Sequence, residues 1–411
     1  MSCQEALSQW EQTVSTHFPA LSRPQARVLA WWSFGMVLAK SCGIIMVCAA
    51  LAIQLGCKEA SLVQRLREWC YGAHEKRGPK RREIEVKTCF APLLGWVLEW
   101  WAVDEQRLAL ALDATTLKKR FTVLVISVMY RGCAIPVAWK VVGAEEAGSW
   151  QPHWLGLLQE LAGSVPPDWT VIVMSDRGLY APWLYAQIVL LGWHPFMRIN
   201  KQGQFRPIGE TPFRSLSTAA AQVGTSWCGI VDCFKQKESR LRCTLLARWD
   251  EGYEEVWLVV TDLAPEQATV VWYGMRSWIE GGFKDTKRGG WHWHQTKMED
   301  PARAERLWLA IAVATLWAVS VGGLSDASLP VSSLDALPQT HIARRKASGR
   351  ARPRMLSCFA RGILTIVGTL LRGDGLVLGR FVPEPWPSSP PRPKKTKNAK
   401  HKAHQASQEA A

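Results

Sequence analysis

Two aspartates follow apolar segments at positions where carboxylates could share one ligand. Asp113 follows an alternation of leucine and alanine over residues 108–112, and Asp176 follows the apolar run 171–175. A carboxylate beside a buried strand costs free energy unless it is paired, hydrogen-bonded or metal-bound. Ligands gather at the carboxyl ends of strands in α/β sheets, so the two aspartates suggest one site. Taken singly, each could equally well cap the next turn or helix.

A third carboxylate, Glu280, lies among cations at regular spacing. Tyr273, Glu280 and Lys287 recur every seven residues, and Arg276 and Lys284 fall between them. In a helix this spacing predicts one face for all five residues. One acid amid three cations suits a surface that meets phosphate near a metal ion. The alternative is a solvated face on which Glu280 and Lys284 form an ordinary i,i+4 pair.

The segments that must position these residues alternate between strand and helix patterns. We expect strands at 107–115, 121–130, 135–142, 169–175 and 194–199, and helices at 150–161 and 181–191. Further antiparallel strands are expected within 200–265, and helices follow, up to Lys287 and over 302–319. This order predicts a mixed α/β sheet flanked by helices, with a β-rich insertion between Asp176 and Glu280.

Both ends of the chain differ from this central part. Residues 1–90 predict a helical domain, with apolar residues at helical spacing from Ala26 to Leu55 and a shorter helix at Ser61–Tyr71. The basic run at 76–82 suits DNA binding, or else a solvated linker. Residues 323–384 predict a basic, partly helical region, and 385–411 a disordered basic tail able to add non-specific DNA affinity.

Composition narrows the choice of partner and compartment. The net charge of +15 over 411 residues favours a polyanion, either nucleic acid or an anionic membrane. The apolar stretch Val28–Leu55 is interrupted by Lys40, and Leu307–Val319 is too short to span a bilayer, so no membrane partner is expected. The 11 cysteines form no pair or cluster at zinc-binding spacing. They indicate free thiols in a reducing cytoplasm.

The spacing of four residues resembles a known signature. Tyr273, Arg276, Glu280 and Lys287 are separated by two, three and six residues. This order resembles the Tyr–Arg–Glu–Lys signature of the IS-four-like group of bacterial insertion-sequence transposases, which carry a DDE domain with a ribonuclease H-like core. The segment 112–115 resembles the strand of the first aspartate, and 176–178 the region of the second. The resemblance covers residues 91–322, including the β-rich segment at about 200–265.

The resemblance implies a chemistry and a set of partners. Two divalent ions, normally Mg²⁺ with Mn²⁺ able to substitute, would be held by Asp113, Asp176 and Glu280, with Asp113 bridging both. The ions would support strand cleavage and transfer in cut-and-paste transposition. The partners would be double-stranded DNA, as transposon ends and target, and a second copy of the chain in a homodimer. DNA phosphates would be contacted by Tyr273, Arg276, Lys287, Lys284 and Arg177.

Two other functions stay open at this level. A ribonuclease H-fold nuclease would have the same carboxylates without strand transfer to a target. A catalytically silent descendant of a transposase would bind DNA only. Members of the group can also form a hairpin intermediate and flip a base onto an aromatic side chain of the insertion. The sequence does not choose among Trp227, Trp249 and Trp257 for that role.

Overall fold

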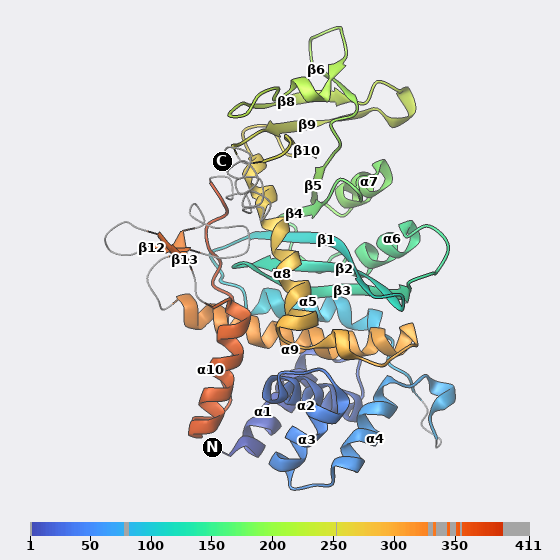
Figure 1. Cartoon of the computed structure of the whole chain (residues 1–411), viewed down its shortest axis with the longest axis vertical. Helices are drawn as coiled ribbons and strands as arrows, with labels where there is room; N and C mark the ends of the chain where they lie inside the picture. Colours follow the sequence, from blue (N-terminus) through green and yellow to red (C-terminus); the bar gives the residue numbers. More distant parts are fainter. Residues whose placement is uncertain are drawn as a thin grey trace, which may run out of the picture.

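The structure is a computed structural model that describes residues 2–77, 82–251, 253–327, 332–333, 343–345, 351–353 and 356–388. Figure 1 shows three tiers along the long axis: an antiparallel part of the sheet at the top, the main sheet in the middle, and a layer of helices below. One hydrophobic core runs through the lower two tiers, from Trp10 in the first helix to Leu110 in the main sheet. The boundary near residue 90 therefore stays a prediction.

The main sheet has five strands: β1 (Arg107–Leu117), β2 (Phe121–Tyr130), β3 (Cys133–Gly143), β4 (Thr170–Ser175) and β5 (His194–Arg198). Their order is β3-β2-β1-β4-β5, and only β2 runs against the others. That order and direction are those of a ribonuclease H-like sheet, so the predicted fold class is confirmed. The expected strands agree because buried strands read as apolar runs bounded by turns.

The insertion extends this same sheet. Its strands are β6 (Gln204–Pro207), β7 (Arg214–Ser215), β8 (Ser226–Cys233), β9 (Leu241–Arg248) and β10 (Trp257–Thr261). β10 pairs antiparallel with β5, joining Val259 to Arg198 and Val260 to Met197. Among the described residues, the sheet continues β5-β10-β9-β8-β6-β7. The predicted antiparallel strands are present, but no pattern in the sequence indicated that they would continue the main sheet.

The N-terminal layer is formed by α1 (Cys3–His17), α2 (Arg23–Ala39), α3 (Ile44–Leu55), α4 (Glu59–Cys70) and α5 (Phe90–Glu99). The expectation of one continuous helix from Ala26 to Leu55 is wrong, since α2 and α3 meet at 94°. Lys40 adopts a left-handed conformation with φ 47° and ends α2, and Gly43 begins α3 as its N-cap. Both helices bury apolar residues, so the apolar spacing continues across a break that it cannot reveal.

Helix α9 (Pro301–Ala327) is the central helix and is longer than expected. It packs between β3 and α2, as Figure 1 shows. The expectation that this stretch is too short to span a bilayer is wrong. Among the described residues it is the one single helix long and apolar enough, and 94% of its most apolar window is buried inside the protein. A helix that is apolar all round is explained by burial on all sides.

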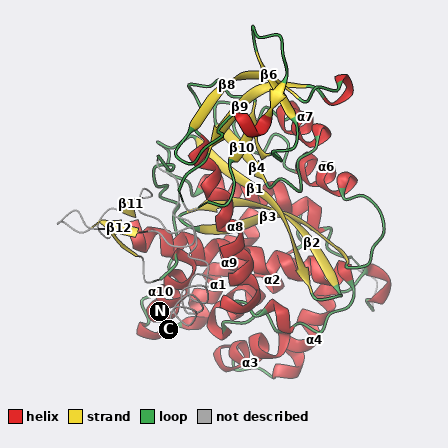
Figure 2. Ribbon diagram, turned by 45° about the horizontal axis from the view of Figure 1, so that its top comes forward, coloured by secondary structure: helices red, strands yellow, loops and turns green. Residues whose placement is uncertain are grey.

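The remaining described α-helices pack on the sheet or on α9 (Figure 2). They are α6 (Gln151–Glu160), α7 (Pro182–Leu190), α8 (Trp278–Lys284) and α10 (Cys358–Arg372). α6 packs against β2 and β3, α7 against β5, and α10 against α9. At the α9–α10 contact, a Cβ on Gly362 would lie 1.6 Å from the carbonyl oxygen of Ala318. The two helices can approach this closely because that residue has no side chain.

Short elements complete the described chain. The 3₁₀ and π segments are η1 (Ala73–Glu75), η2 (Val86–Cys89), η3 (Leu216–Thr218), η4 (Lys237–Ser239), η5 (Val270–Ser277), η6 (Asp285–Gly289) and η7 (Trp293–Gln295). A small separate sheet contains β11 (Ser332–Ser333), β12 (Ala343–Arg345) and β13 (Ala351–Pro353). Of the predicted basic tail at 385–411, residues 389–411 lie outside the described residues.

A buried ion-pair network fastens the C-terminal segment to the sheet. Arg131, in the turn between β2 and β3, donates from Nη1 to Asp326 Oδ2 at 3.2 Å and to Glu384 Oε1 at 2.7 Å. Its Nε donates to the carbonyl oxygen of Val382 at 2.7 Å. Each of the three charged residues is at most 9% exposed. One guanidinium therefore joins the hairpin, the end of α9 and the last described segment.

Candidate active site

Asp113 and Asp176 are brought side by side by the parallel pairing of β1 with β4. The register matches Leu112 with Ser175, so the two aspartates follow one matched pair. The sequence predicted Asp113 near the end of a strand at 107–115. In the structure β1 runs on to Leu117 and stays paired with β2 over that length. What ends beside Asp113 is the neighbouring strand β4.

The alternation of side chains along β1 decides which face Asp113 occupies. Leu108 and Leu110 join the core shared with the helical layer, whereas Ala109 and Ala111 join a second core with η5 and α8. Asp113 is two residues after Ala111, and side chains two residues apart in a strand lie on the same face. It therefore lies on the face that carries η5 and α8. The small residues before it let that helical segment lie close to the sheet.

Asp176 has both roles that the sequence left open, since it caps a turn and also faces the shared site. Its Oδ1 accepts hydrogen bonds from the backbone N–H of Gly178 and of Leu179, both at 3.0 Å, and so caps the turn after β4. Its Oδ2 lies 3.6 Å from Nη2 of Arg276. Capping therefore occupies one oxygen of the carboxylate and leaves the other directed at the shared site.

Arg276 joins the two aspartates. Its Nη2 donates to Asp113 Oδ2 at 2.8 Å and lies at the stated longer distance from Asp176. The side chain of Arg276 is only 14% exposed and that of Asp113 only 18%. Among the described residues, the buried Nε of Arg276 makes no hydrogen bond. The family resemblance implies a phosphate contact for this arginine, and in the structure its charge faces the two carboxylates.

The expected single polar face around Glu280 is wrong. The segment passes from 3₁₀ geometry in η5 through α8 to a π turn in η6, and these geometries have different numbers of residues per turn. Tyr273 is buried and donates from its hydroxyl to the carbonyl oxygen of Ser175 at 3.2 Å. Glu280 and Lys284 are exposed, whereas Lys287 is half-buried. The signature residues thus have distinct environments.

Gly282 lets α8 approach the sheet. A Cβ at this position would lie 2.7 Å from Cβ of Ala134 in β3. Glycine is unfavourable inside a helix by about 1 kcal/mol relative to alanine, so local propensity does not account for it. The close packing does, and it fixes the helix that carries Glu280.

The three carboxylates influence one another electrostatically. Burial raises the pKa of Asp113, the Arg276 charge and the Ala114 N–H lower it, and the charges of Asp176 and Glu280 raise it again. Carboxylate oxygens are the ligands that Mg²⁺ and Mn²⁺ prefer, and Asp113 and Asp176 already share one cation. Within the part of the chain that the structure describes, no three His, Cys, Asp or Glu side chains stand ready to hold a metal ion.

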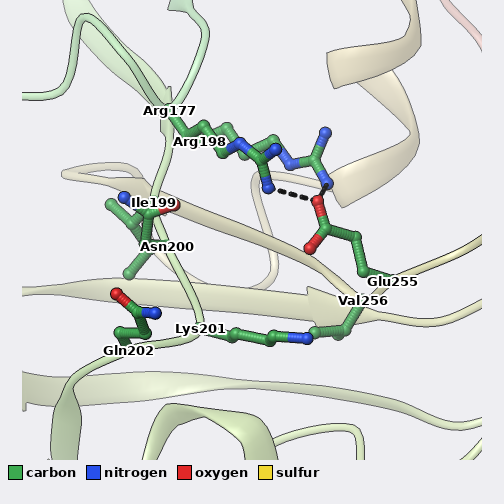
Figure 3. Close-up of a pocket in the computed structure, with 8 residues that line it drawn as sticks. All are labelled: Arg177, Arg198, Ile199, Asn200, Lys201, Gln202, Glu255 and Val256. Carbon is green, nitrogen blue, oxygen red and sulfur yellow. Dashed lines mark hydrogen bonds and ion pairs between the residues drawn. The ribbon is translucent and has the colours of Figure 1, made fainter.

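The predicted cation Arg177 is engaged elsewhere. Arg177 and Arg198 both bind the carboxylate of Glu255, the latter at 3.1 Å. Figure 3 shows these residues around a pocket of about 110 Å³, with Lys201 across from the two arginines. Sequence analysis missed Glu255, which precedes β10 and has no distinguishing pattern around it. Its charge holds both arginines beside the carboxyl end of β4.

The three candidate tryptophans of the insertion differ in position. Trp257 packs against Tyr273 with ring centroids 5.4 Å apart. Trp227 packs against Phe205 at a similar separation of 5.4 Å, and the indole N–H of Trp249 donates to the carbonyl oxygen of Tyr253. Of the three, Trp257 is the one whose ring contacts a residue of the signature.

A fourth acidic residue, Asp285, lies in η6 and has no place in the sequence prediction. Burial raises the pKa of its carboxyl to about 7, opposed by the charge of Lys284. The folded protein therefore keeps this proton well above the pH at which the unfolded chain loses it. The contribution of the protonated Asp285 carboxyl to the free energy of unfolding is fully present below the ordinary aspartate pKa. It is lost as pH rises from about 4 to 7.

Asp285→Asn should remove this loss because asparagine stays neutral. The free energy of unfolding of the variant, relative to the wild type, should increase between pH 5 and pH 7 and then level off. Urea denaturation at pH 5, 6, 7 and 8 measures it. A difference that does not change with pH would contradict a protonated Asp285.

A protein family and a solved structure are similar to this chain. Residues 105–317, just over half of the chain, match the family described as transposase DDE domain. A cryo-EM structure of a piggyBac transposase synaptic complex with hairpin DNA is similar at 10% sequence identity, covering 80% of this chain and 74% of that one, with a TM-score of 0.39. No curated protein matches the chain. The extent of the family match shows that the chain belongs to the transposase DDE domain family.

Proposed function

We propose that this protein cleaves and joins DNA strands at the ends of an insertion sequence, in a divalent-metal-dependent reaction of the cut-and-paste type. The observation that carries the proposal is the pairing of Asp113 with Asp176 across β1 and β4, on the face where α8 presents Glu280. The family match supplies the class of enzyme. The two aspartates that share one cation supply the reason to locate its chemistry here.

In this proposal each carboxylate has a separate task. Asp113, the most buried, would bridge two ions, while Asp176 and Glu280 would each hold one. Bound Mg²⁺ or Mn²⁺ would activate the attacking water or 3′-hydroxyl and stabilise the leaving oxygen. Tyr273 would act from the core, since its hydroxyl fastens η5 to the end of β4 through Ser175. It keeps η5 and the following α8 against the aspartates.

The DNA phosphates would be met by the cations on the open side of α8 and η6. Lys284 is exposed, and Lys287 is half-buried beside Arg288, so that burial and the neighbouring charge lower its pKa. A second basic surface lies in the N-terminal layer, in a groove of about 920 Å³ lined by Arg65, Arg82 and Trp31. We assign this groove to DNA as well. A homodimer on paired ends and a cytoplasmic location belong to the same proposal.

Lys284→Ala and Lys287→Ala should each weaken DNA binding without sequence preference and lower the slope of log Kd against log salt by about 1. Arg65→Ala should act in the same way if the N-terminal groove meets DNA. Fluorescence anisotropy of a labelled duplex at several salt concentrations measures this. Lys237→Ala, an exposed lysine in the turn before β9, is the matched control and should leave the slope unchanged. Equal slopes for all variants would exclude these contacts.

The direct test of the proposal is cleavage of the DNA that flanks this gene. Purified protein is incubated with that DNA and with Mg²⁺, Mn²⁺ or EDTA, the wild type beside Asp176→Asn. We expect metal-dependent nicks at the ends of the element that the variant cannot make, followed by joining to a target plasmid. Cleavage without joining would favour a ribonuclease H-fold nuclease. Binding without cleavage in both proteins would favour a silent descendant.

A further inference from the structure

We infer that Arg276 is a built-in counter-cation of the two aspartates, which leaves them when divalent metal binds and then becomes available to a DNA phosphate. The inference rests on the proposed function, because it takes Asp113 and Asp176 as metal ligands. It adds that metal loading and DNA binding are coupled through one side chain.

The contacts of Arg276 match those of a substitute cation. A single nitrogen, Nη2, faces Oδ2 of both aspartates, at 2.8 Å and 3.6 Å. No parallel two-nitrogen pairing is formed with either carboxylate, although arginine is well suited to it. The guanidinium thus lies between the two carboxylate oxygens that the proposed function assigns to metal binding.

Burial explains why the protein needs a cation there. The Asp113 and Arg276 side chains are 18% and 14% exposed, and that of Asp176 is 39% exposed. Two neighbouring carboxylates, one of them largely buried, would repel each other with no cation between them. Arg276 supplies that charge from the chain itself. Its fit is incomplete, since the buried Nε makes no hydrogen bond within the described residues. An unsatisfied buried N–H lowers the cost of leaving this position.

The exchange has a consequence for affinity. A metal ion can bind only when Arg276 has left, so the measured Kd of the free protein is the intrinsic Kd divided by the fraction in which Arg276 is displaced. DNA that offers a phosphate to Arg276 increases that fraction and tightens metal binding. By linkage, metal must tighten DNA binding by the same factor. The site would then assemble fully only on its substrate.

The test measures Mn²⁺ binding by electron paramagnetic resonance, with no cleavage readout. We compare the wild type with the single variants Arg276→Gln, Arg276→Lys and Asp113→Asn, and with the double variant that combines Asp113→Asn and Arg276→Gln. Each protein is measured with and without a duplex oligonucleotide. Arg276→Gln should bind Mn²⁺ at least about tenfold more tightly than wild type if the displaced fraction is near one in ten. Arg276→Lys should lie between them. The duplex should tighten Mn²⁺ binding in the wild type and have little effect in Arg276→Gln.

The outcomes separate this inference from the proposed function. If Mn²⁺ binding depends on Asp113 but Arg276→Gln binds no more tightly than wild type, the exchange is wrong and the metal site stands. If no protein binds Mn²⁺ in an Asp113-dependent way, with or without DNA, both are wrong. If Arg276→Gln fails to fold, the wild type and Arg276→Lys are compared instead. If the duplex tightens Mn²⁺ binding in neither of them, the coupling between metal and DNA binding is wrong.

Discussion

Asp113→Asn is expected to reduce the rate of metal-dependent DNA cleavage by about a thousandfold or more, because a metal ligand supplies several kcal/mol of transition-state stabilisation. Asn keeps the shape of the side chain and its capacity to accept from Ala114 N–H, so the fold should persist. The variant loses the negative charge that holds a cation. Asp113 is the most sensitive position, since it lies on the central strand of the main sheet beside both partners.

The measurement is single-turnover cleavage of an end-containing duplex with Mg²⁺, with anisotropy as the readout of DNA binding. Asp104→Asn is the control: it makes the same change nine residues earlier, at an exposed position before β1, and should cleave like the wild type. Retained cleavage by Asp113→Asn would remove this residue from the site. Loss of both cleavage and DNA binding would point to misfolding instead.

Arg131→Met should lower the free energy of unfolding by about 3–5 kcal/mol, the usual cost of removing one partner from a buried charge network. The substitution keeps an apolar stem of similar length and leaves Asp326 and Glu384 buried without this guanidinium. It also removes the hydrogen bond to Val382. The C-terminal segment should therefore loosen from the sheet before the rest of the protein unfolds.

Urea denaturation followed by far-UV circular dichroism, with limited proteolysis at the C-terminal segment, checks this expectation. Arg372→Met is the matched control. Its ion pair with Asp374 is 63% and 52% exposed at the two side chains, so its removal should change stability by less than about 1 kcal/mol. Equal effects of the two substitutions would show that the Arg131 network contributes no more than a surface pair.

The sequence was most informative where a structural signal is local. The strands at Phe121–Tyr130 and around β4 follow from apolar runs between turns, and α6 and α7 from helical spacing. The aspartates were found by their places after such runs. Local patterns failed where the same residue spacing fits two different structures. The apolar spacing across α2 and α3 fits one helix as well as two, and the apolar residues of α9 continue without a change that would mark its end.

The geometry around Glu280 shows the same limit. A seven-residue repeat predicts one helical face only if the backbone keeps α-helical geometry throughout. η5 has 3₁₀ geometry and η6 has π geometry, and contacts with distant parts of the chain, such as the hydrogen bond of Tyr273 to Ser175, act on this segment. The spacing of the signature was readable, but the environments of its members were not.

By itself, the sequence determined the succession of strands and helices, the three carboxylates in chain order and the basic character of the chain, since all of these depend on residue type and short-range spacing. Tertiary structure alone decided which charges meet. Arg276 pairs with Asp113 across 163 positions, Arg177 with Glu255 across 78, and Arg131 with Glu384 across 253. Such pairs depend on strand order and on how closely helices approach the sheet, and no periodicity in the sequence records either one.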